Sequence, residues 1–387
     1  MPCGPLPPPI PTMADLLVLK ALDAESAAAP EFRYLLSQVL LAARRVFGAV
    51  ELATDPTALP ALGRATAVLA LGAENALLGE ASLAAMREAL AAGAAEVRPT
   101  PLAAAGLALD EPVYTLRGYE RAEARFLADP ARREPPPSHL PVALWSAGRF
   151  TEIVRHVPPE RLLRDPAALA AGSTGTAAAG LCHLFIDYYG EVRDDVLPYV
   201  PATAEDVLEI GCGRGLTGEL LQRRLGCRVT GVELNPEVAK DAGRRLHAVR
   251  QGDVQTLDIE GQFDVVLALE LFEHLTDNER FLARARELLR PGGRLVLSVP
   301  NVGHWAVVED LLAGRWDYLP IGLLCYTHYR FFTRRTLADW LARAGFERCE
   351  IVAQKTELPD RMAALAATLE IDRDSLATKG FYVVASR

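Results

Sequence analysis

The sequence predicts an α/β fold in two domains, and three observations lead to it. The chain has 387 residues, which is more than one ordinary domain. Strand-like apolar runs alternate with helical patterns, which indicates sheets covered by helices. The strand-like run 207–210 continues into Gly211, Gly213 and Gly215 and then into a helical pattern. A strand that enters a helix through glycines is typical of a nucleotide site, because the helix N-terminus offers unpaired N–H groups.

The first 180 residues predict a smaller α/β domain. We expect a disordered, proline-rich lead-in over 1–12, an accessory α/β domain over 13–135, and a linker with a helical segment over 136–180. Alternating strands and helices favour a small parallel sheet in the accessory domain. Its expected elements are helix 32–45, strands 48–53 and 65–71, helix 82–92 and strand 95–98.

Residues 181–387 predict a larger domain with the glycine-rich turn near its start. A helix is expected over 181–197, ahead of the first strand. Two strand-like runs at the end predict an antiparallel pair at the sheet edge. The expected strands are 207–210, 228–233, 263–269, 294–299, 347–352 and 381–385. The expected helices are 216–225, 236–246 and 277–289, and the insertion 356–379 is expected to contain a helical stretch.

Side chains near the ends of the expected strands point to a nucleoside ligand. Leu216 stands where a dinucleotide fingerprint needs Gly or Ala, which disfavours NAD. Glu233 ends the second strand, where a carboxylate can accept both ribose hydroxyls. Asp253 can accept a hydrogen bond from an adenine amino group, and Val254 can pack on the ring. The sequence therefore predicts an adenosine site.

These motifs resemble those of the class I S-adenosylmethionine (SAM)-dependent methyltransferases, which have a Rossmann-like fold. Five segments match in order, namely 207–215, 231–234, 252–254, 263–275 and 288–297. The resemblance covers 181–387 and implies an enzyme that uses SAM. The cofactor-binding residues that it implies are Gly211, Gly213, Gly215, Glu233, Leu234, Asp253, Val254, Leu269 and Tyr188, the last over the methionine end of SAM.

Methyl transfer to a hydroxyl also requires a group that removes a proton. Glu270-Leu-Phe-Glu-His274 matches a Glu-x-x-Glu-His signature of ubiquinone-biosynthesis-type O-methyltransferases, which is linked to divalent-metal dependence. The resemblance offers Glu270, Glu273 and His274 as ligands of Mg²⁺. It also offers Glu273 and His274 as catalytic groups. Such an enzyme would lose activity in EDTA.

His328 is the alternative proton acceptor, and the one we favour. It lies in Thr327-His-Tyr-Arg-Phe-Phe-Thr333, which resembles a segment of methyltransferases associated with cell-surface glycans and small metabolites. With an ordinary pKa of about 6.5, a histidine base would make the rate rise with pH in that region and would tolerate chelators. Asn301, His304 and Trp305 are expected to line the acceptor pocket.

Charge and composition restrict the kinds of partner and the cellular compartment that we expect for this protein. The net charge of -9 argues against a nucleic-acid partner, because phosphate binding needs a basic face. We expect a cytoplasmic protein with no membrane span, since the sequence contains no long apolar run and no signal-peptide pattern at its N-terminus. The six cysteines are not spaced as zinc ligands.

The N-terminal half resembles a GT-A glycosyltransferase domain, in which a strand such as 65–71 leads into an Asp-x-Asp metal site. Here that place is Gly72-Ala-Glu-Asn75, so we expect a degenerate accessory domain that positions an acceptor or builds a homodimer. The predicted function is SAM-dependent O-methylation of a sugar or small metabolite, with a small-molecule or glycan acceptor. The alternative is a bifunctional or scaffold protein whose N-terminal domain binds a glycan or nucleotide sugar, with methylation secondary.

Overall fold

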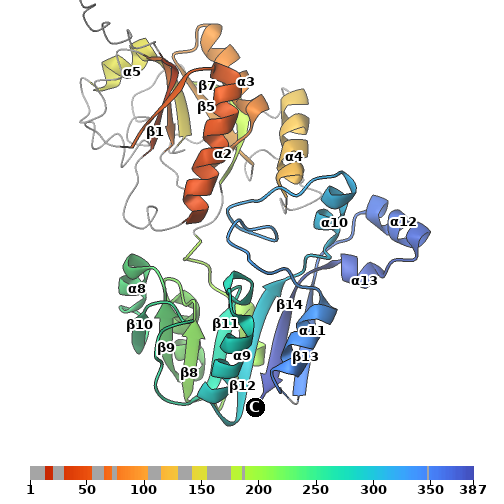
Figure 1. Cartoon of the computed structure of the whole chain (residues 1–387). Coiled ribbons are helices and arrows are strands. Elements are labelled where there is room, and N and C mark those ends of the chain that lie inside the picture. The colour runs from red at the N-terminus through yellow and green to blue at the C-terminus, as the bar shows by residue number, and fades with distance from the viewer. Residues whose placement is uncertain are drawn as a thin grey trace, which may run out of the picture. The chain divides into compact units, whose positions relative to one another are not determined.

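The computed structural model forms two compact units, each built on a seven-stranded sheet (Figure 1). The first unit holds most of the described residues up to Leu184, and the second holds those from Tyr188 onward. The lead-in 1–12 and Gly72–Asn75 lie outside the described residues. The structure describes residues 14–20, 30–54, 65–71, 76–102, 115–129, 142–154, 176–184, 188–346 and 348–387.

The first sheet has the strand order β2-β1-β3-β6-β5-β7-β4 and is mixed. Its strands are β1 Ala14–Lys20, β2 Val50–Ala53, β3 Ala65–Leu71, β4 Ala76–Leu78, β5 Glu96–Pro101, β6 Val142–Ser146 and β7 Thr176–Leu184. β1 pairs in parallel with β2 and β3, and β5 with β7. β6 runs antiparallel to β3 and β5, and β4 runs antiparallel to β7. The expectation of a parallel sheet is therefore wrong, because β4 and β6 were not recognised in the sequence.

One face of the first sheet is covered by α2 and α3. The helices of this unit are α2 Pro30–Phe47, α3 Glu80–Ala91, α4 Leu116–Ala128 and α5 Ala147–Val154. Val39 and Ala43 from α2, with Leu83 and Met86 from α3, join the buried cluster that contains Leu69. The apolar positions of these helices recur every three or four residues, which places them on one face.

The middle of the chain differs from the sequence prediction in two places. The stretch 136–180, predicted as a linker with a helical segment, contains the helix α5, but its described residues also include β6 and the first part of β7. The helix predicted over 181–197 is instead the end of β7, then a turn at Tyr188–Tyr189, then the 3₁₀ helix η5 Asp194–Tyr199. β7 pairs with both β5 and β4, and this pairing outweighs the helix propensity of its alanines.

The second sheet has the strand order β10-β9-β8-β11-β12-β14-β13. Its strands are β8 Asp206–Ile210, β9 Arg228–Glu233, β10 Ala248–Gln251, β11 Phe263–Leu269, β12 Leu289–Pro300, β13 Arg348–Lys355 and β14 Thr378–Ser386. The first five strands in this order are parallel, whereas β14 runs antiparallel to β12 and β13. The predicted antiparallel pair at the edge is confirmed.

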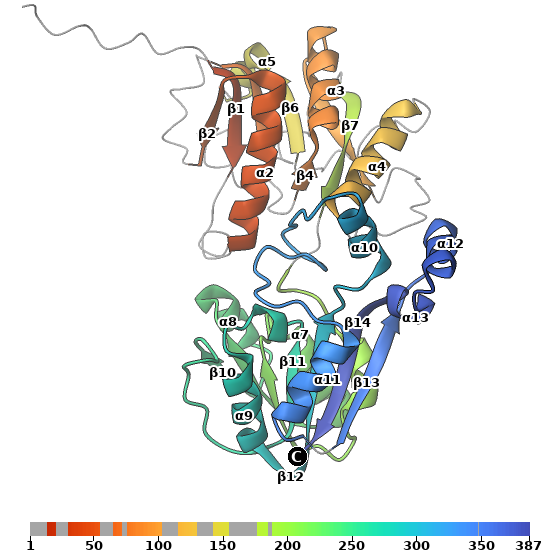
Figure 2. The same cartoon turned by 45° about the vertical axis from the view of Figure 1, so that its right-hand side comes forward.

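Helices cover both faces of the second sheet, and Figure 2 shows α9 and α11 together on one of them. A buried cluster joins α9 and α11 to that face, and another joins η5, α7 and α8 to the opposite face. The loops after β8, β9 and β11 therefore meet at the carboxyl edge, where open α/β sheets bind ligands. The helices are α7 Leu216–Leu225, α8 Pro236–Ala242, η6 Phe272–His274, α9 Asn278–Leu288, α10 Trp305–Leu312, α11 Arg334–Arg343, α12 Asp360–Leu369 and α13 Arg373–Leu376.

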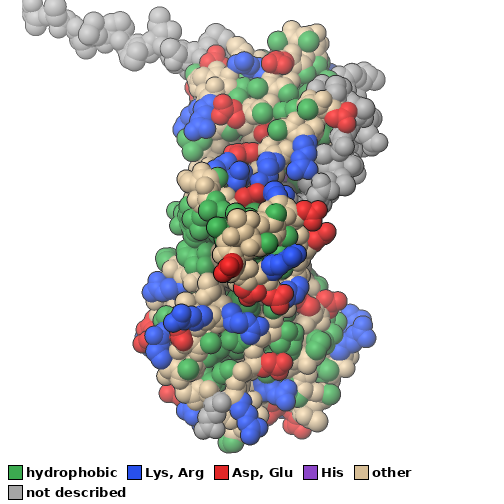
Figure 3. Space-filling model, turned by 90° about the vertical axis from the view of Figure 1, so that its right-hand side faces the viewer, with side chains coloured by type: hydrophobic (Ala, Val, Ile, Leu, Met, Phe, Trp, Pro, Cys, Tyr) green, Lys and Arg blue, Asp and Glu red, His purple; other side chains and the backbone are tan. Residues whose placement is uncertain are grey.

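The surface mixes charges of both signs. Figure 3 shows Lys and Arg side chains interspersed with Asp and Glu over the described part of one face. Each helix in the described ranges is too short or too polar to cross a bilayer.

Candidate active site

The glycine loop between β8 and α7 has a backbone that only glycine adopts readily. Gly211, Gly213 and Gly215 have φ values of 73°, 53° and 78°. A Cβ on Gly213 would lie 2.7 Å from the carbonyl oxygen of Tyr189. The N–H of Arg214 donates to that same carbonyl at 2.9 Å. The contact with the Tyr189 backbone therefore requires glycine at position 213, whether or not a ligand also approaches it.

Glu233 links the end of β9 to this loop. Its side chain is buried, with Oε2 accepting from the N–H of Gly213 at 3.0 Å and Oε1 accepting from the N–H of Asn235 at 2.8 Å. Burial raises the pKa of this carboxyl, while the backbone N–H groups oppose the rise. Because an ionised carboxylate has about four acceptor sites, these backbone contacts leave capacity for a further donor.

The other expected cofactor residues gather around the same edge of the sheet. Leu234 follows β9 and is 65% exposed, which leaves its side chain free to contact a ligand ring. Asp253 and Val254 follow β10 and are partly buried, and Asp253 accepts from the N–H of Gln255 at 2.9 Å. Leu269 ends β11. Tyr188 lies in the turn before η5, with its ring edge-on to Tyr189 at 5.0 Å.

The tip of β11 carries a strained residue. Glu270 has φ 50°, which is uncommon for a residue with a side chain. Its N–H donates to the carbonyl and the hydroxyl of Ser298, and its Oε1 accepts from that hydroxyl at 2.7 Å. Arg193 lies 3.8 Å from the same oxygen. Glu270 is therefore held by β12 and Arg193.

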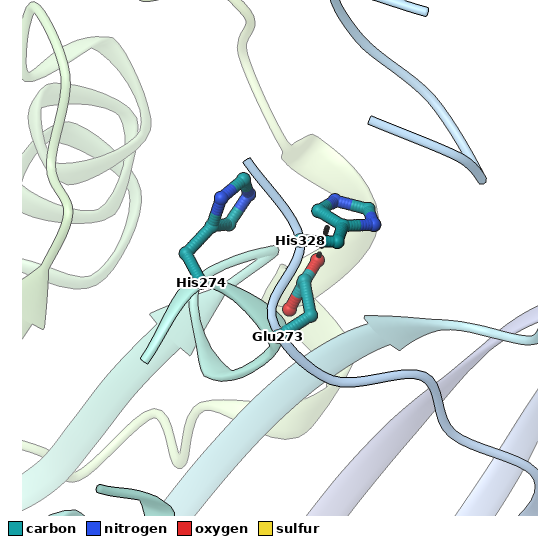
Figure 4. Close-up of side chains that lie close together, drawn as sticks. All are labelled: Glu273, His274 and His328. Atoms are coloured by element: carbon teal, nitrogen blue, oxygen red, sulfur yellow. Dashed lines mark ion pairs between the residues drawn. The ribbon is translucent and has the colours of Figure 1, made fainter. Parts of the chain in front are cut away.

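A separate cluster brings Glu273 and His274 of η6 together with His328 (Figure 4). One potential ligand atom from each residue lies within 4.8 Å of the other two. Nε2 of His328 is 3.9 Å from Oε1 of Glu273, which is too long for a hydrogen bond. The metal ligands predicted from the sequence were Glu270, Glu273 and His274, but the described residues group His328 with the last two instead of Glu270. The side chain of Glu270 is turned to Ser298.

The cluster is buried, and several of its polar atoms lack hydrogen-bond partners within the described residues. Glu273 is fully buried, and within the described ranges neither of its carboxylate oxygens has a hydrogen-bond partner. Nδ1 of His328 is likewise buried without a partner there. Such groups are rare in native proteins and indicate a ligand, an ion or a proton that the site handles.

Burial also sets the protonation of the cluster. It lowers the pKa of His328 to about 3 and that of His274 to about 4, because the charged imidazolium loses hydration. It raises the pKa of Glu273 well above its ordinary value, and the nearby Glu270 carboxylate adds to the rise. Both imidazoles are therefore neutral near pH 7, and burial makes His328 a weaker base than a histidine with its ordinary pKa.

The sequence analysis expects Asn301, His304 and Trp305 to line an open acceptor pocket. In the structure they do not. All three are almost completely buried. Asn301 donates to the carbonyls of Ser375 and Thr378, and His304 caps α10 and bonds the Thr356 hydroxyl at 2.9 Å. Trp305 packs in a cluster with α12 and α13. These residues anchor the segment 356–379 to the end of β12.

Two residues at the site were missed in the sequence. Arg193 donates its backbone N–H to the hydroxyl of Thr217 in the first turn of α7, and its guanidinium bonds Asp195 and the hydroxyl of Tyr382. Leu271 lies beside Gly211, 3.4 Å from where a Cβ would be. Arg193 belongs to no motif, whereas Leu271 lies within the matched segment 263–275 but at a position that the Glu-x-x-Glu-His signature leaves variable.

A cavity of about 370 Å³ lies between the segment after β10 and α9. Its walls include Ile210 and Val254, but not the glycine loop, Glu233 or the cluster around Glu273. We therefore do not assign it to the cofactor.

Comparison with known proteins identifies the family. A methyltransferase-domain family matches residues 184–351. A ubiquinone biosynthesis O-methyltransferase of Xanthomonas axonopodis pv. citri is 32% identical over 200 residues, which are 47% of this chain and 81% of that protein. One from Xanthomonas campestris pv. campestris is 31% identical over 199 residues, 48% of this chain and 81% of that protein.

A solved structure of a SAM-dependent methyltransferase from Archaeoglobus fulgidus is 19% identical, with a TM-score of 0.39, and covers 50% of this chain and 90% of that one. The chain belongs to the class I SAM-dependent methyltransferases. It is an enzyme whose cofactor is SAM.

Proposed function

We propose that the second unit transfers the methyl group of SAM to a hydroxyl oxygen of a small molecule. The observation that carries the proposal is the cluster of Glu273, His274 and His328, whose buried polar atoms lack partners within the described part of the chain. The O-methyltransferases among the relatives support a hydroxyl acceptor. A sugar is one acceptor class to be tested, because no residue named here selects for it.

In this proposal the cofactor residues and the cluster have separate tasks. The glycine loop, Glu233, Leu234, Asp253, Val254, Leu269 and Tyr188 hold SAM, and Arg193 supplies a cation for its carboxylate. The hydroxyl oxygen attacks the methyl carbon, and the carbon–sulfur bond breaks to leave S-adenosylhomocysteine. The hydroxyl proton must move to the protein as the new bond forms.

His328 is the proposed proton acceptor, with Glu273 beside it. A neutral imidazole has the lone pair that the proton needs, but burial makes it a weak base. Burial favours the protonated form of Glu273, but a positive charge on His328 at 3.9 Å would favour the ionised form, which in turn would stabilise the imidazolium. The two residues therefore act together, and removing either one should impair transfer.

A divalent cation such as Mg²⁺ is the alternative partner of this cluster. The unpartnered carboxylate of Glu273 and the neutral imidazoles of His274 and His328 fit the donor set of a cation. Such a cation would lower the pKa of the acceptor hydroxyl.

Transfer of labelled methyl groups to a panel of phenols, sugars and other small hydroxyl compounds tests the proposal. His328→Ala and Glu273→Gln should each lower the rate by about 10²–10⁴-fold. The exposed His247→Ala and Glu279→Gln serve as matched controls. Loss in EDTA with recovery in Mg²⁺ would assign the cluster to a metal, and full activity in both cluster variants would refute its role.

For the first unit we propose an accessory role, as a domain that positions the acceptor or builds a homodimer. The segment Gly72–Asn75, on which the comparison with glycosyltransferases depends, lies outside the described residues. Manganese-dependent transfer from any nucleotide sugar by the full chain would contradict this proposal.

A further inference from the structure

We propose that Asp195 and Tyr382 are positioning residues, which aim the guanidinium of Arg193 at the carboxylate of SAM. The inference rests on the proposed role of Arg193 as the cation for that carboxylate, and it does not depend on which acceptor is methylated. Asp195 and Tyr382 both lie outside the five matched motif segments, and both act through Arg193 rather than on the cofactor itself.

The segment that carries Arg193 is fixed next to the glycine loop. The backbone N–H of Arg193 donates to the hydroxyl of Thr217 at 3.0 Å. Thr217 is buried and lies in the first turn of α7, the helix that follows the loop. Because open α/β sheets bind their ligands at this edge, the backbone at position 193 lies beside the expected cofactor site.

Asp195 holds one edge of the Arg193 guanidinium. Nε and Nη2 of Arg193 donate to Oδ1 and Oδ2 of Asp195 at 3.1 and 3.3 Å, which is the two-pronged geometry in which an arginine binds a carboxylate. Burial alone would raise the pKa of Asp195, but hydrogen bonds with Arg193 and Tyr382 lower it. Asp195 is therefore ionised near pH 7 and fixes the orientation of the guanidinium plane.

Tyr382 holds the same guanidinium from the side of the sheet. Its hydroxyl accepts from Nη2 of Arg193 at 2.5 Å, and Cζ of Arg193 lies 5.5 Å from the centroid of its ring. The ring is almost completely buried and packs against that of Tyr199, with centroids 4.7 Å apart. Tyr382 lies on β14, where it pairs with Ser298 of β12. Tyr382 is therefore a rigid support, because its strand pairs on both sides and a neighbouring ring fixes its side chain.

The contacts with Asp195 and Tyr382 determine where Nη1 of Arg193 lies. With Nε and Nη2 held, Nη1 lies at the tip of β11, 3.8 Å from Oε1 of Glu270, which is too long for a hydrogen bond. Glu270 directly follows Leu269, an expected cofactor residue. The carboxylate is the only negatively charged group of SAM at neutral pH. An arginine that is already oriented binds it without the entropic cost of ordering a flexible side chain.

Calorimetry of the full chain with two cofactor analogues tests the proposal. S-adenosylhomocysteine carries the carboxylate, whereas its decarboxylated form keeps the amine and lacks the carboxylate. Asp195→Ala and Tyr382→Phe should each weaken binding of S-adenosylhomocysteine about three- to tenfold, and should leave binding of the decarboxylated form within about twofold of wild type. Asp194→Ala, in the same turn of η5, and Tyr199→Phe are matched controls that should bind both analogues like wild type.

A variant of Arg193 separates the positioning role from the proposed function. Arg193→Met should weaken binding of S-adenosylhomocysteine about tenfold or more. In that background Asp195→Ala and Tyr382→Phe should cause no further loss, because both residues act through the guanidinium. Unchanged affinity in Arg193→Met would refute the role of Arg193 and the inference with it. If Arg193→Met loses affinity but the other two variants do not, or if they weaken both analogues equally, only the positioning role is refuted.

Discussion

Both units bury charged side chains, but they pair them differently. In the first unit, Nε of Arg98 donates to Oε1 of Glu96 at 2.6 Å, with both side chains 2% exposed. The two residues lie on the same face of β5, two positions apart. In the second unit, the Glu273 carboxyl accepts no hydrogen bond within the described residues, and its Oε1 lies 3.9 Å from Nε2 of His328. One arrangement is an ion pair within a strand, and the other is an unsatisfied group just beyond a strand end.

This difference separates a structural pair from a functional cluster. A buried ion pair stabilises the fold only while both partners remain, because removal of one leaves a buried charge. A buried carboxyl without a partner already costs stability, and natural proteins keep such groups where chemistry requires them. Substitutions in the two places should therefore have opposite consequences for folding and activity.

The largest effect on stability is expected for Arg98→Met. It leaves the buried Glu96 carboxylate without its guanidinium, and should lower the stability of the first sheet by about 3–5 kcal/mol. Glu273→Gln removes a buried carboxyl that has no hydrogen-bond partner within the described residues, and should leave stability unchanged or raise it. Hydrogen exchange at the amides of β5 and β11 measures the two effects. Equal destabilisation by both variants would remove the distinction.

Glu209 provides an intermediate case. It is buried, but a hydrogen bond with the backbone N–H of Gly218 offsets part of the rise in pKa that burial causes. Burial raises its pKa to about 8, so the folded state holds a proton that the unfolded state releases above its own lower pKa. The protonated Glu209 carboxyl therefore contributes stability that is fully present below the unfolded-state pKa. This contribution falls by about 1 kcal/mol per pH unit as the pH rises from there to about 8. Chemical unfolding from pH 5 to 9 should show this slope in wild type. Glu209→Gln should flatten it, and an unchanged slope would contradict the assignment.

A smaller effect distinguishes the glycine loop from an ordinary turn. Gly213 and Gly226 both have positive φ, but a Cβ would meet the Tyr189 carbonyl at 2.7 Å only at Gly213, and nothing within 4 Å at Gly226. Gly213→Ala should weaken SAM binding at least tenfold, or about 1.4 kcal/mol. Calorimetry with Gly226→Ala as the matched control separates the clash from backbone strain. Similar affinities for both variants would argue against a special role of the loop.

Local patterns predicted much of the second unit. The bounds of α7, β9 and β11 were predicted as observed, because glycines and strong apolar periodicity mark them. β7 was missed, since its alanine-rich sequence becomes a strand only by pairing with β4 and β5. The Glu-x-x-Glu-His signature predicted that Glu270 would share a site with Glu273. In the structure, His328 from a distant segment lies beside Glu273 instead. Spacing alone cannot show which side chain turns toward Ser298.

Comparison of cofactor binding with methyl transfer in Glu273→Gln tests the central claim most directly. S-adenosylhomocysteine affinity is measured by calorimetry, and transfer from SAM is measured in a single turnover with an accepted hydroxyl compound. The account predicts an affinity within about twofold of wild type and transfer slower by about 10²-fold or more. Transfer at the wild-type rate, or a loss of affinity that accounts for the slower transfer, would contradict it.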